Sequence, residues 1–383
     1  AAETKAEEPA TEVTDRINVT KLTDYLYEVT MDDYEQYYDV AMERIKKRFN
    51  IGGCSSVQNG KIRGRNYDWT YDNASSFVVR VPAAEGRHAS VGIAAAAALT
   101  EEQILAGEDK AAILSKAYTT LDGVNDAGLA ININVVNYEE KGKFKMRTED
   151  PSDDIFPIFV IRKVLDQAGT VEEALAMMDK MDVMSLGTED EAHFMLSGKT
   201  SATDDTFKTV VVEYVPDAKG DYYMNVIENF VDDKPIMTNF HLTDFDGTVE
   251  SLTPHPMGYE RYLLLSKSFD QGNTVLGMAD LMSKVYFTKN YDLYKDNFWY
   301  SEFSKNAGLT LKDAGEPNLN GDISRAGAYA EIVEKEVNNY LARSRDGGPK
   351  TWQTVHTSVI DCENKTLSVI PQEGRIAYTY SVE

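Results

Sequence analysis

The sequence predicts a layered α/β or α+β domain, because strand-like runs alternate with helical patterns along much of its 383 residues. Residues 128–136 alternate between apolar and polar side chains, as a half-buried strand does. Residues 155–168 and 171–181 carry apolar side chains at helical spacing. Gly169-Thr170 lies between them and suits the end of one helix and the cap of the next.

The remaining elements divide the chain into a leader and a main domain. Further strands are expected at residues 22–30, 76–81, 209–215, 222–230, 352–360 and 365–370, and further helices at about 32–49, 259–266, 274–285 and 324–343. Residues 1–53 are predicted to be a separate piece, with a disordered tail at 1–15 followed by an ordered, dockable propeptide. The main domain is predicted to span residues 54–383.

Composition excludes several classes of partner. The chain has 63 acidic and 39 basic residues and a formal charge of −24, which argues against binding to nucleic acid or to an anionic membrane surface. The longest apolar run, residues 91–99, is about half of the ~20 residues that a transmembrane helix needs. The disordered tail is typical of a chain from which an export signal or lipid-anchor segment has been removed, so we expect an exported protein.

Cysteine and histidine usage predicts neither a disulfide framework nor a metal site. Cys54 and Cys362 are the only cysteines, which leaves one disulfide bridge between them as an alternative to two free thiols. The five histidines (His88, His193, His241, His255 and His356) show no metal-ligand spacing. No cofactor is expected.

Cys54 is the candidate nucleophile because it begins a predicted hairpin. Asn59-Gly60, flanked by short strand-like runs, is a strong hairpin signal. If these two residues form the turn, Cys54 lies opposite Arg65, and Cβ atoms of opposed residues are about 5 Å apart. A neighbouring cation favours the reactive thiolate. Asp68, three residues after Arg65, is close enough to join the same site.

A nucleophilic thiol needs a base, and two sources are open. The fold could bring one of the histidines to Cys54. Alternatively, a cut between Gly53 and Cys54 would free an α-amine of pKa about 8 on the nucleophile itself. Gly52-Gly53 would let the thiol reach the Gly53 carbonyl and move the acyl group to sulfur, after which water would release residues 1–53. A flexible Gly-Gly joint before a strand is the plainer interpretation.

Several segments in order resemble the choloylglycine hydrolase family, which includes bile salt hydrolases and penicillin V acylases and is related to N-acylethanolamine acid amidase. The matching segments are Cys54-Ser55-Ser56, Gly64-Arg65-Asn66-Tyr67-Asp68-Trp69, Asn125-Asp126-Ala127-Gly128-Leu129, Met237-Thr238-Asn239, Glu260-Arg261-Tyr262 and residues 352–367. The likeness covers residues 54 to about 370. The spacing from the cysteine to Gly-Arg-Asn-x-Asp is its most distinctive part.

The resemblance implies a role for each matching residue. Cys54 is the nucleophile and its freed amine the base, and Arg65 and Asp68 hold and polarise the thiol and amine. Asn239 binds the amine or helps the oxyanion, and Arg261 completes the charged network. Asn134 is the expected oxyanion residue, with Asn132 on the same strand face as the alternative. Each residue also has a plainer interpretation: a surface ion pair for Arg65 and Asp68, a turn residue for Asn239, a polar helix face for Arg261 and a solvated strand face for both strand asparagines.

The resemblance also implies the fold and the reaction. The fold is α+β, an N-terminal-nucleophile hydrolase αββα sandwich of two mainly antiparallel sheets. The reaction is hydrolysis of linear amides in small N-acyl substrates. Bile salts, penicillin V, N-acylethanolamines and N-acyl homoserine lactones stay open as substrates. An uncut binding protein of the same fold is the remaining alternative. Two departures from the family pattern put bile-acid preference and tetramer formation in doubt, although a homo-oligomer stays open. The 53-residue leader is closer in layout to the acylases and amidases that mature by cutting themselves, and the 21 residues between Asn239 and Arg261 are fewer than the insertion that helps many bile salt hydrolases form tetramers.

Overall fold

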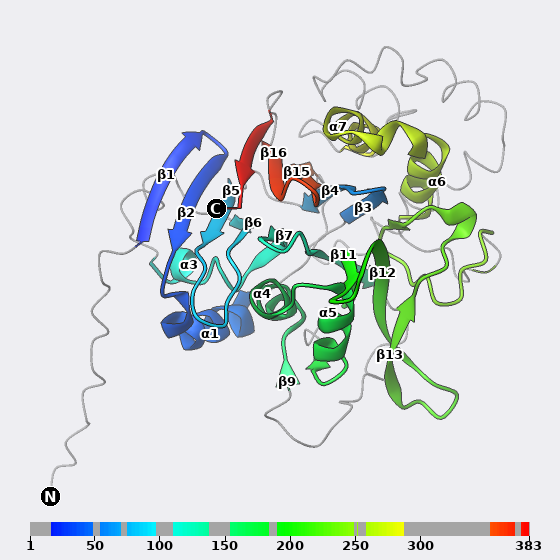
Figure 1. Ribbon diagram of the computed structural model, residues 1–383, viewed down its shortest axis with the longest axis horizontal. Coiled ribbons are helices and arrows are strands. Elements are labelled where there is room, and N and C mark those ends of the chain that lie inside the picture. Colours follow the sequence, from blue (N-terminus) through cyan, green and yellow to red (C-terminus); the bar gives the residue numbers. More distant parts are fainter. Residues whose placement is uncertain are drawn as a thin grey trace, which may run out of the picture.

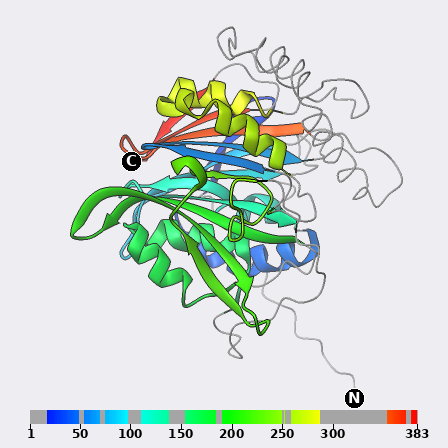
Figure 2. The ribbon, with the colours of Figure 1, turned by 90° about the vertical axis from the view of Figure 1, so that its right-hand side faces the viewer.

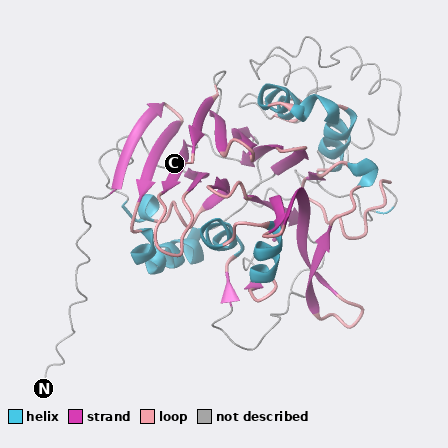
Figure 3. Cartoon of the chain, in the orientation of Figure 1, coloured by secondary structure: helices cyan, strands magenta, loops and turns pink. Residues whose placement is uncertain are grey.

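The computed structural model describes residues 17–48, 54–69, 75–96, 110–137, 154–183, 190–248, 251, 258–286, 353–371 and 377–382. Two β-sheets lie one on the other, and helices cover both outer faces (Figure 1, Figure 2). Helices and strands therefore occupy separate layers (Figure 3). The predicted α+β class and the αββα order of layers are confirmed.

The larger sheet contains nine strands. Their order is β1 (Ile17–Thr23), β2 (Leu26–Met31), β5 (Ser75–Val81), β6 (Ser90–Ala96), β7 (Thr120–Asn125), β8 (Ala130–Asn137), β11 (Asp190–Ser201), β12 (Asp204–Pro216) and β13 (Tyr222–Ile227). Neighbours are antiparallel except β2 and β5, which run parallel. A separate short parallel pair joins β9 (Asp154–Ile155) and β10 (Asp182–Val183).

The smaller sheet contains six antiparallel strands. Their order is β14 (Ile236–Met237), β3 (Cys54–Asn59), β4 (Ile62–Trp69), β15 (Gln353–Asp361), β16 (Thr366–Pro371) and β17 (Tyr378–Ser381). β4 pairs with β15, which is almost 300 residues away in sequence, so the strand that carries Arg65 and Asp68 lies inside the sheet. An inner strand of this kind buries both of its faces.

Helices pack on the outer faces of the two sheets. On the larger sheet these are η1 (Tyr34–Tyr37), α1 (Tyr38–Arg48), α3 (Lys110–Leu114), α4 (Pro157–Gln167) and α5 (Val171–Met178), and on the smaller sheet α6 (Tyr259–Lys267), η4 (Phe269–Asn273) and α7 (Val275–Ser283). The short η2 (Val231–Asp233) precedes β14. Thr170 caps α5 as predicted: its hydroxyl accepts from the Glu173 N–H, while the Glu173 carboxylate accepts from the Thr170 N–H.

The alternation in β8 decides which side chains face the space between the sheets. Ile131, Ile133 and Val135 pack in the apolar core beneath α4 and α5. The side chains between them, Asn132 and Asn134, therefore face the smaller sheet. Both are completely buried, so their amide groups must find hydrogen-bond partners there.

The leader forms part of the larger sheet. β1 and β2 extend that sheet beyond β5, and Tyr34 and Tyr37 of η1 are buried in its core. The helix expected at about 32–49 is present as η1 and α1, whereas the tail at 1–15 and the helix at 324–343 lie outside the described residues. A domain boundary between residues 53 and 54 stays a prediction.

No helix among the described residues is long and apolar enough to cross a membrane.

Candidate active site

Cys54 is the first residue of β3, but the predicted register of its hairpin is wrong. The turn consists of Gly60 and Lys61, not Asn59 and Gly60, so Asn59 pairs with Ile62 and Cys54 pairs with Tyr67. The first central position of this turn has a positive φ, which glycine adopts more easily than other residues, and Gly60, with a φ of 55°, takes that position. The strand pairing is therefore shifted by two residues from the predicted one.

Arg65 nevertheless reaches the thiol. It pairs with Ser56, two residues along the strand from Cys54 and on the same face. Its Nη2 lies 3.2 Å from Cys54 Sγ and also donates to the Ile133 carbonyl at 3.0 Å. The thiol and the guanidinium therefore lie side by side as expected. They come from residues that are diagonal to each other in the hairpin and not directly opposed.

A buried acid balances the Arg65 charge. Arg65 Nη1 lies 3.6 Å from Asp122 Oδ2, and the Ser358 hydroxyl donates to the same oxygen at 2.6 Å. The Arg65 guanidinium also lies over the Tyr67 ring, 5.3 Å from its centroid. Sequence reasoning missed Asp122 and Ser358. An acid between Leu121 and Gly123 in a short strand-like run was the available signal for the first.

Asp68 and Arg261 meet behind Cys54. The Thr354 hydroxyl donates to Asp68 Oδ1 at 2.6 Å, and Asp68 Oδ2 lies 3.8 Å from Arg261 Nη1. Burial raises the pKa of the Asp68 carboxyl to about 6, although Arg261, Thr354 and Arg65 each act to lower it. Thr354 was also missed, because only the pairing of β4 with β15 brings it close.

Asn239 and Arg261 hold the backbone of Cys54. The Cys54 N–H donates to Asn239 Oδ1 at 3.1 Å, and Arg261 Nη1 donates to the Cys54 carbonyl at 2.6 Å. Arg261 Nη2 also donates to Asn239 Oδ1, at 2.5 Å, so one oxygen joins both groups. Asn239 Nδ2 is anchored on the Val135 carbonyl at 2.6 Å. The amide nitrogen that a cut would convert into an amine is therefore already bound by Asn239.

Asn134 and Asn132 lie next to this cluster. Asn134 Oδ1 accepts from Arg65 Nε at 3.4 Å and from the Ser56 hydroxyl at 3.1 Å. Asn134 Nδ2 donates to the Met237 and Thr238 carbonyls at 3.0 and 3.3 Å. Asn132 Nδ2 donates to the Ser56 hydroxyl at 2.8 Å. The choice between these two asparagines as the oxyanion residue stays a prediction.

Cys54 carries a buried thiol. It forms no disulfide bridge with Cys362, so the alternative of a bridge between the two is wrong. Burial raises the pKa of the Cys54 thiol, against the opposing effect of the Arg65 and Arg261 cations. In the uncut chain burial therefore favours the neutral thiol over the thiolate, although the Arg65 contact alone would favour the thiolate.

The histidines in the described part of the chain have other partners. His88 contacts Asp126, His193 and His241 lie beside Glu213, and His356 is hydrogen-bonded to Ser76. Burial, followed by the Arg65 cation, lowers the pKa of His356 well below its ordinary value. A Cys–His dyad gains no support from these contacts. Within the described ranges, no group of three or more His, Cys, Asp or Glu side chains is arranged to bind a metal ion.

The raised pKa of Asp68 leads us to expect that the stability of the protein depends on pH. The Asp68 pKa of about 6 in the folded chain exceeds its ordinary value of 3.8, so the folded chain keeps a proton that the unfolded chain releases. The resulting stability is fully present below pH 3.8 and is lost as the pH rises through 6. Between pH 4 and 7 we therefore expect the unfolding free energy of wild type to fall, relative to Asp68→Asn, by on the order of 3 kcal/mol.

Urea unfolding at each pH measures this difference, with both proteins carrying Cys54→Ala so that the chain stays uncut and refolds as one molecule. Asp205→Asn makes the same chemical change at a carboxyl that is 91% exposed and provides the matched control. Parallel pH profiles for wild type and Asp68→Asn would contradict the assignment.

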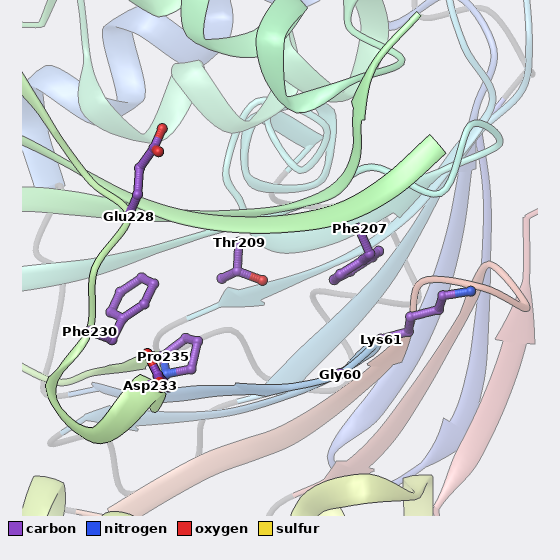
Figure 4. Close-up of a pocket in the computed structure, with 8 residues that line it drawn as sticks. All are labelled: Gly60, Lys61, Phe207, Thr209, Glu228, Phe230, Asp233 and Pro235. Carbon is purple, nitrogen blue, oxygen red and sulfur yellow. The ribbon is translucent and has the colours of Figure 1, made fainter. Parts of the chain in front are cut away.

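A cleft of 460 Å³ lies at the far end of β3 (Figure 4). Its lining residues are Gly60, Lys61, Phe207, Thr209, Glu228, Phe230, Asp233 and Pro235. A strand rises about 3.4 Å per residue, so the turn of this hairpin lies about 20 Å from Cys54. The cleft is therefore separate from the cluster around the thiol.

The arrangement of the cluster suits acyl transfer to sulfur. Buried polar side chains hold the thiol, the N–H and the carbonyl of one cysteine, an arrangement suited to a nucleophile that attacks acyl groups. The chain belongs to the linear amide C–N hydrolases of the choloylglycine hydrolase family, because the sequence model of that family matches residues 54–292. The predicted membership is thus confirmed.

Solved structures of three similar proteins cover most of the chain. A mutant of the conjugated bile acid hydrolase from Clostridium perfringens is 15% identical, with 86% of this chain and 92% of that chain covered and a TM-score of 0.41. Penicillin V acylase from Agrobacterium tumefaciens is 18% identical, with 86% of each chain covered and a TM-score of 0.37. The Caenorhabditis elegans ortholog of N-acylethanolamine-hydrolyzing acid amidase is 14% identical, with 86% of this chain and 100% of that chain covered and a TM-score of 0.33. No curated protein sequence matches significantly.

Proposed function

We propose that this protein is a cysteine N-terminal-nucleophile hydrolase that cuts its own chain between Gly53 and Cys54 and then cleaves linear amides of small N-acyl substrates. The observation that carries the proposal is the convergence of Arg65, Asn239 and Arg261 on the sulfur, nitrogen and carbonyl oxygen of Cys54. A cysteine that served only to fill the core would need no such set of partners.

The self-cleavage step is an acyl shift followed by hydrolysis. Cys54 Sγ attacks the carbonyl carbon of Gly53, the Gly53–Cys54 C–N bond breaks, and the thiol proton moves to the departing nitrogen. Water then hydrolyses the thioester, which leaves a carboxylate on Gly53 and a free thiol and amine on Cys54. Asn239 already accepts a hydrogen bond from this nitrogen and would hold the new amine.

The same atoms then serve amide hydrolysis. The α-amine, with an ordinary pKa of about 8, takes the thiol proton and passes it to the leaving nitrogen of the substrate. The acyl group remains on Cys54 as a thioester until water releases it. Asn134, or Asn132, together with Asn239 would stabilise the oxyanion, and removal of one such donor costs roughly 3 kcal/mol of barrier.

The substrate is proposed as an N-acyl amide, which family membership supports. Conjugated bile acids and penicillin V are the first substrates to test. N-acylethanolamines and N-acyl homoserine lactones form the second group, because the leader is closer in layout to the acylases and amidases that cut themselves than to bile salt hydrolases that begin at the cysteine. Export of the protein and its assembly into oligomers stay predictions.

N-terminal sequencing of purified, aged protein tests the proposal. A new terminus that reads Cys-Ser-Ser is the expected result. Mass spectrometry of the products from a panel of these amides then identifies the acyl and amine groups that are accepted. An intact 1–383 chain that hydrolyses none of the panel and whose Cys54 resists a thiol-directed electrophile would overturn the proposal in favour of a binding protein.

A further inference from the structure

Four polar side chains form a row across four neighbouring strands of the larger sheet. The row consists of Asn134 on β8, His193 on β11, Glu213 on β12 and Asn225 on β13. Asn134 pairs with His193, His193 Nδ1 lies 3.1 Å from Glu213 Oε1, and Glu213 pairs with Asn225. We call these residues the polar row. Only Asn134 belongs to the site described above.

The polar row binds the segment of residues 237–243, which carries Asn239. Asn134 Nδ2 donates to the Met237 and Thr238 carbonyls, and His193 Nε2 lies 3.0 Å from the Thr238 carbonyl oxygen. The backbone just before Asn239 is therefore held against the sheet.

The far end of the same segment is bound by Glu213. Its Oε1 accepts from the Leu242 N–H at 2.7 Å, and its Oε2 accepts from the Thr243 N–H at 3.0 Å and the Thr243 hydroxyl at 2.6 Å. Asn225 Nδ2 donates to the same hydroxyl at 3.0 Å. Gly258, at the start of α6, packs against the same segment: a Cβ at this position would lie only 3.0 Å from the Asn239 backbone nitrogen.

The charges in this network are deeply buried. The Glu213 and His193 side chains have no exposed surface. Burial alone would raise the pKa of Glu213, but His241, 3.4 Å away, and His193 lower it below its ordinary value. Both ring nitrogens of His193 lie within hydrogen-bonding distance of oxygen atoms, Nδ1 of Glu213 Oε1 and Nε2 of the Thr238 carbonyl oxygen.

A buried ion pair is weak evidence for stability, because apolar side chains of similar volume often serve as well. Its hydrogen bonds do, however, fix one geometry. We infer that Glu213 and His193 are positioning residues, which hold residues 237–243 so that Asn239 Oδ1 meets the nitrogen of Cys54. The inference rests on the proposed function of Cys54.

Glu213→Gln tests this inference. The amide keeps the size of the carboxylate but replaces one of its two acceptor oxygens by an NH2 group, which then faces either the Leu242 N–H or the N–H and O–H of Thr243. Since an error of about 1 Å in a catalytic site costs up to ~100-fold in rate, we expect kcat to fall at least ~10-fold. KM should change less than about twofold, because Asn239 is proposed to act on the Cys54 amine and on the oxyanion, and both contacts serve the transition state and not the binding of the substrate.

The rate of Cys54 alkylation by iodoacetamide supplies a second measurement, which needs no substrate. In a Cys362→Ala background, which leaves one thiol, we expect alkylation of Glu213→Gln to be several-fold slower than that of the parent. Thr243→Val removes one donor to Glu213 without removing the charge and should give a smaller change in the same direction. This variant also decides the inference if Glu213→Gln fails to fold.

Glu228→Gln is the matched control. Glu228 follows β13, its side chain is 48% exposed, and it pairs with Lys208 outside the polar row, so both rates should equal those of wild type. Unchanged kcat and alkylation in folded Glu213→Gln and Thr243→Val would overturn the inference. A wild-type protein that hydrolyses no amide would overturn the proposed function instead, and the alkylation rates would still decide the role of Glu213.

Discussion

Replacement of Cys54 by alanine is expected to leave the chain uncut and to abolish amide hydrolysis. Both reactions need the same sulfur atom, so one substitution should remove both. Loss of a catalytic nucleophile lowers kcat by up to about 10⁶-fold in well-studied hydrolases, and we expect a loss of at least about 10⁴-fold here. Intact mass measures the cut, and release of the amine product measures hydrolysis.

Cys362→Ala is the matched control for this substitution. Cys362 also carries a buried thiol, only 4% exposed, but it lies beyond the end of β15 and outside the Cys54 cluster. This variant should cut itself and hydrolyse amides as wild type does. Residual cutting or hydrolysis by Cys54→Ala would show that another group is the nucleophile.

Removal of the leader is expected to have the largest effect on stability. The chain of residues 54–383 lacks β1, β2, η1 and α1 and exposes the edge of β5. Among the described leader residues, seven core side chains are at most 5% exposed, namely Leu26, Tyr27, Val29, Met31, Tyr34, Tyr37 and Ala41. Burial of a large apolar side chain contributes about 1.5–3 kcal/mol. Their loss therefore removes on the order of 10 kcal/mol, comparable with the ~5–15 kcal/mol that stabilises a whole domain.

Polar contacts also join the leader to the main domain. The Tyr34 hydroxyl donates to Asp166 Oδ2, Arg80 Nε lies 2.5 Å from Glu28 Oε1, and Arg87 Nη2 donates to the Asp32 carbonyl at 2.8 Å. A cut after Gly53 breaks none of these contacts. We therefore expect the two pieces to copurify and to separate only in denaturant, instead of the leader being released.

Solubility and cooperative urea unfolding of residues 54–383 measure the effect of removing the leader. Deletion of residues 1–16 alone, before the first described strand, is the control and should leave unfolding unchanged. A soluble 54–383 chain with wild-type unfolding free energy would show that the leader is dispensable after folding.

The sequence predicted those parts of the fold that depend on local pattern. The alternation in β8 and the cap at Thr170 followed from neighbouring residues, and both were correct. The hairpin register was wrong because an Asn-Gly pair does not say which residue begins the turn. Here the backbone of Gly60 decides it.

The parts of the site that could not be predicted come from distant pairings. Thr354 and Ser358 reach Asp68 and Asp122 only because β15 lies beside β4. The leader joins the sheet through parallel pairing of β2 with β5, which leaves no short-range pattern. The sequence motifs identified Cys54, Arg65, Asp68, Asn239 and Arg261. The side chains that support these residues could be identified only from the structure.

The parallel pairing of β2 with β5 affects whether the cut protein can refold. Between these strands the chain leaves the larger sheet, forms β3 and β4 of the smaller one and returns, and the Gly53–Cys54 bond lies in this excursion. Once the bond is cut, reassembly after denaturation becomes an encounter between two molecules, which depends on their concentration. The cut protein would then fold efficiently only once, and dilution after heat or urea would make its inactivation permanent.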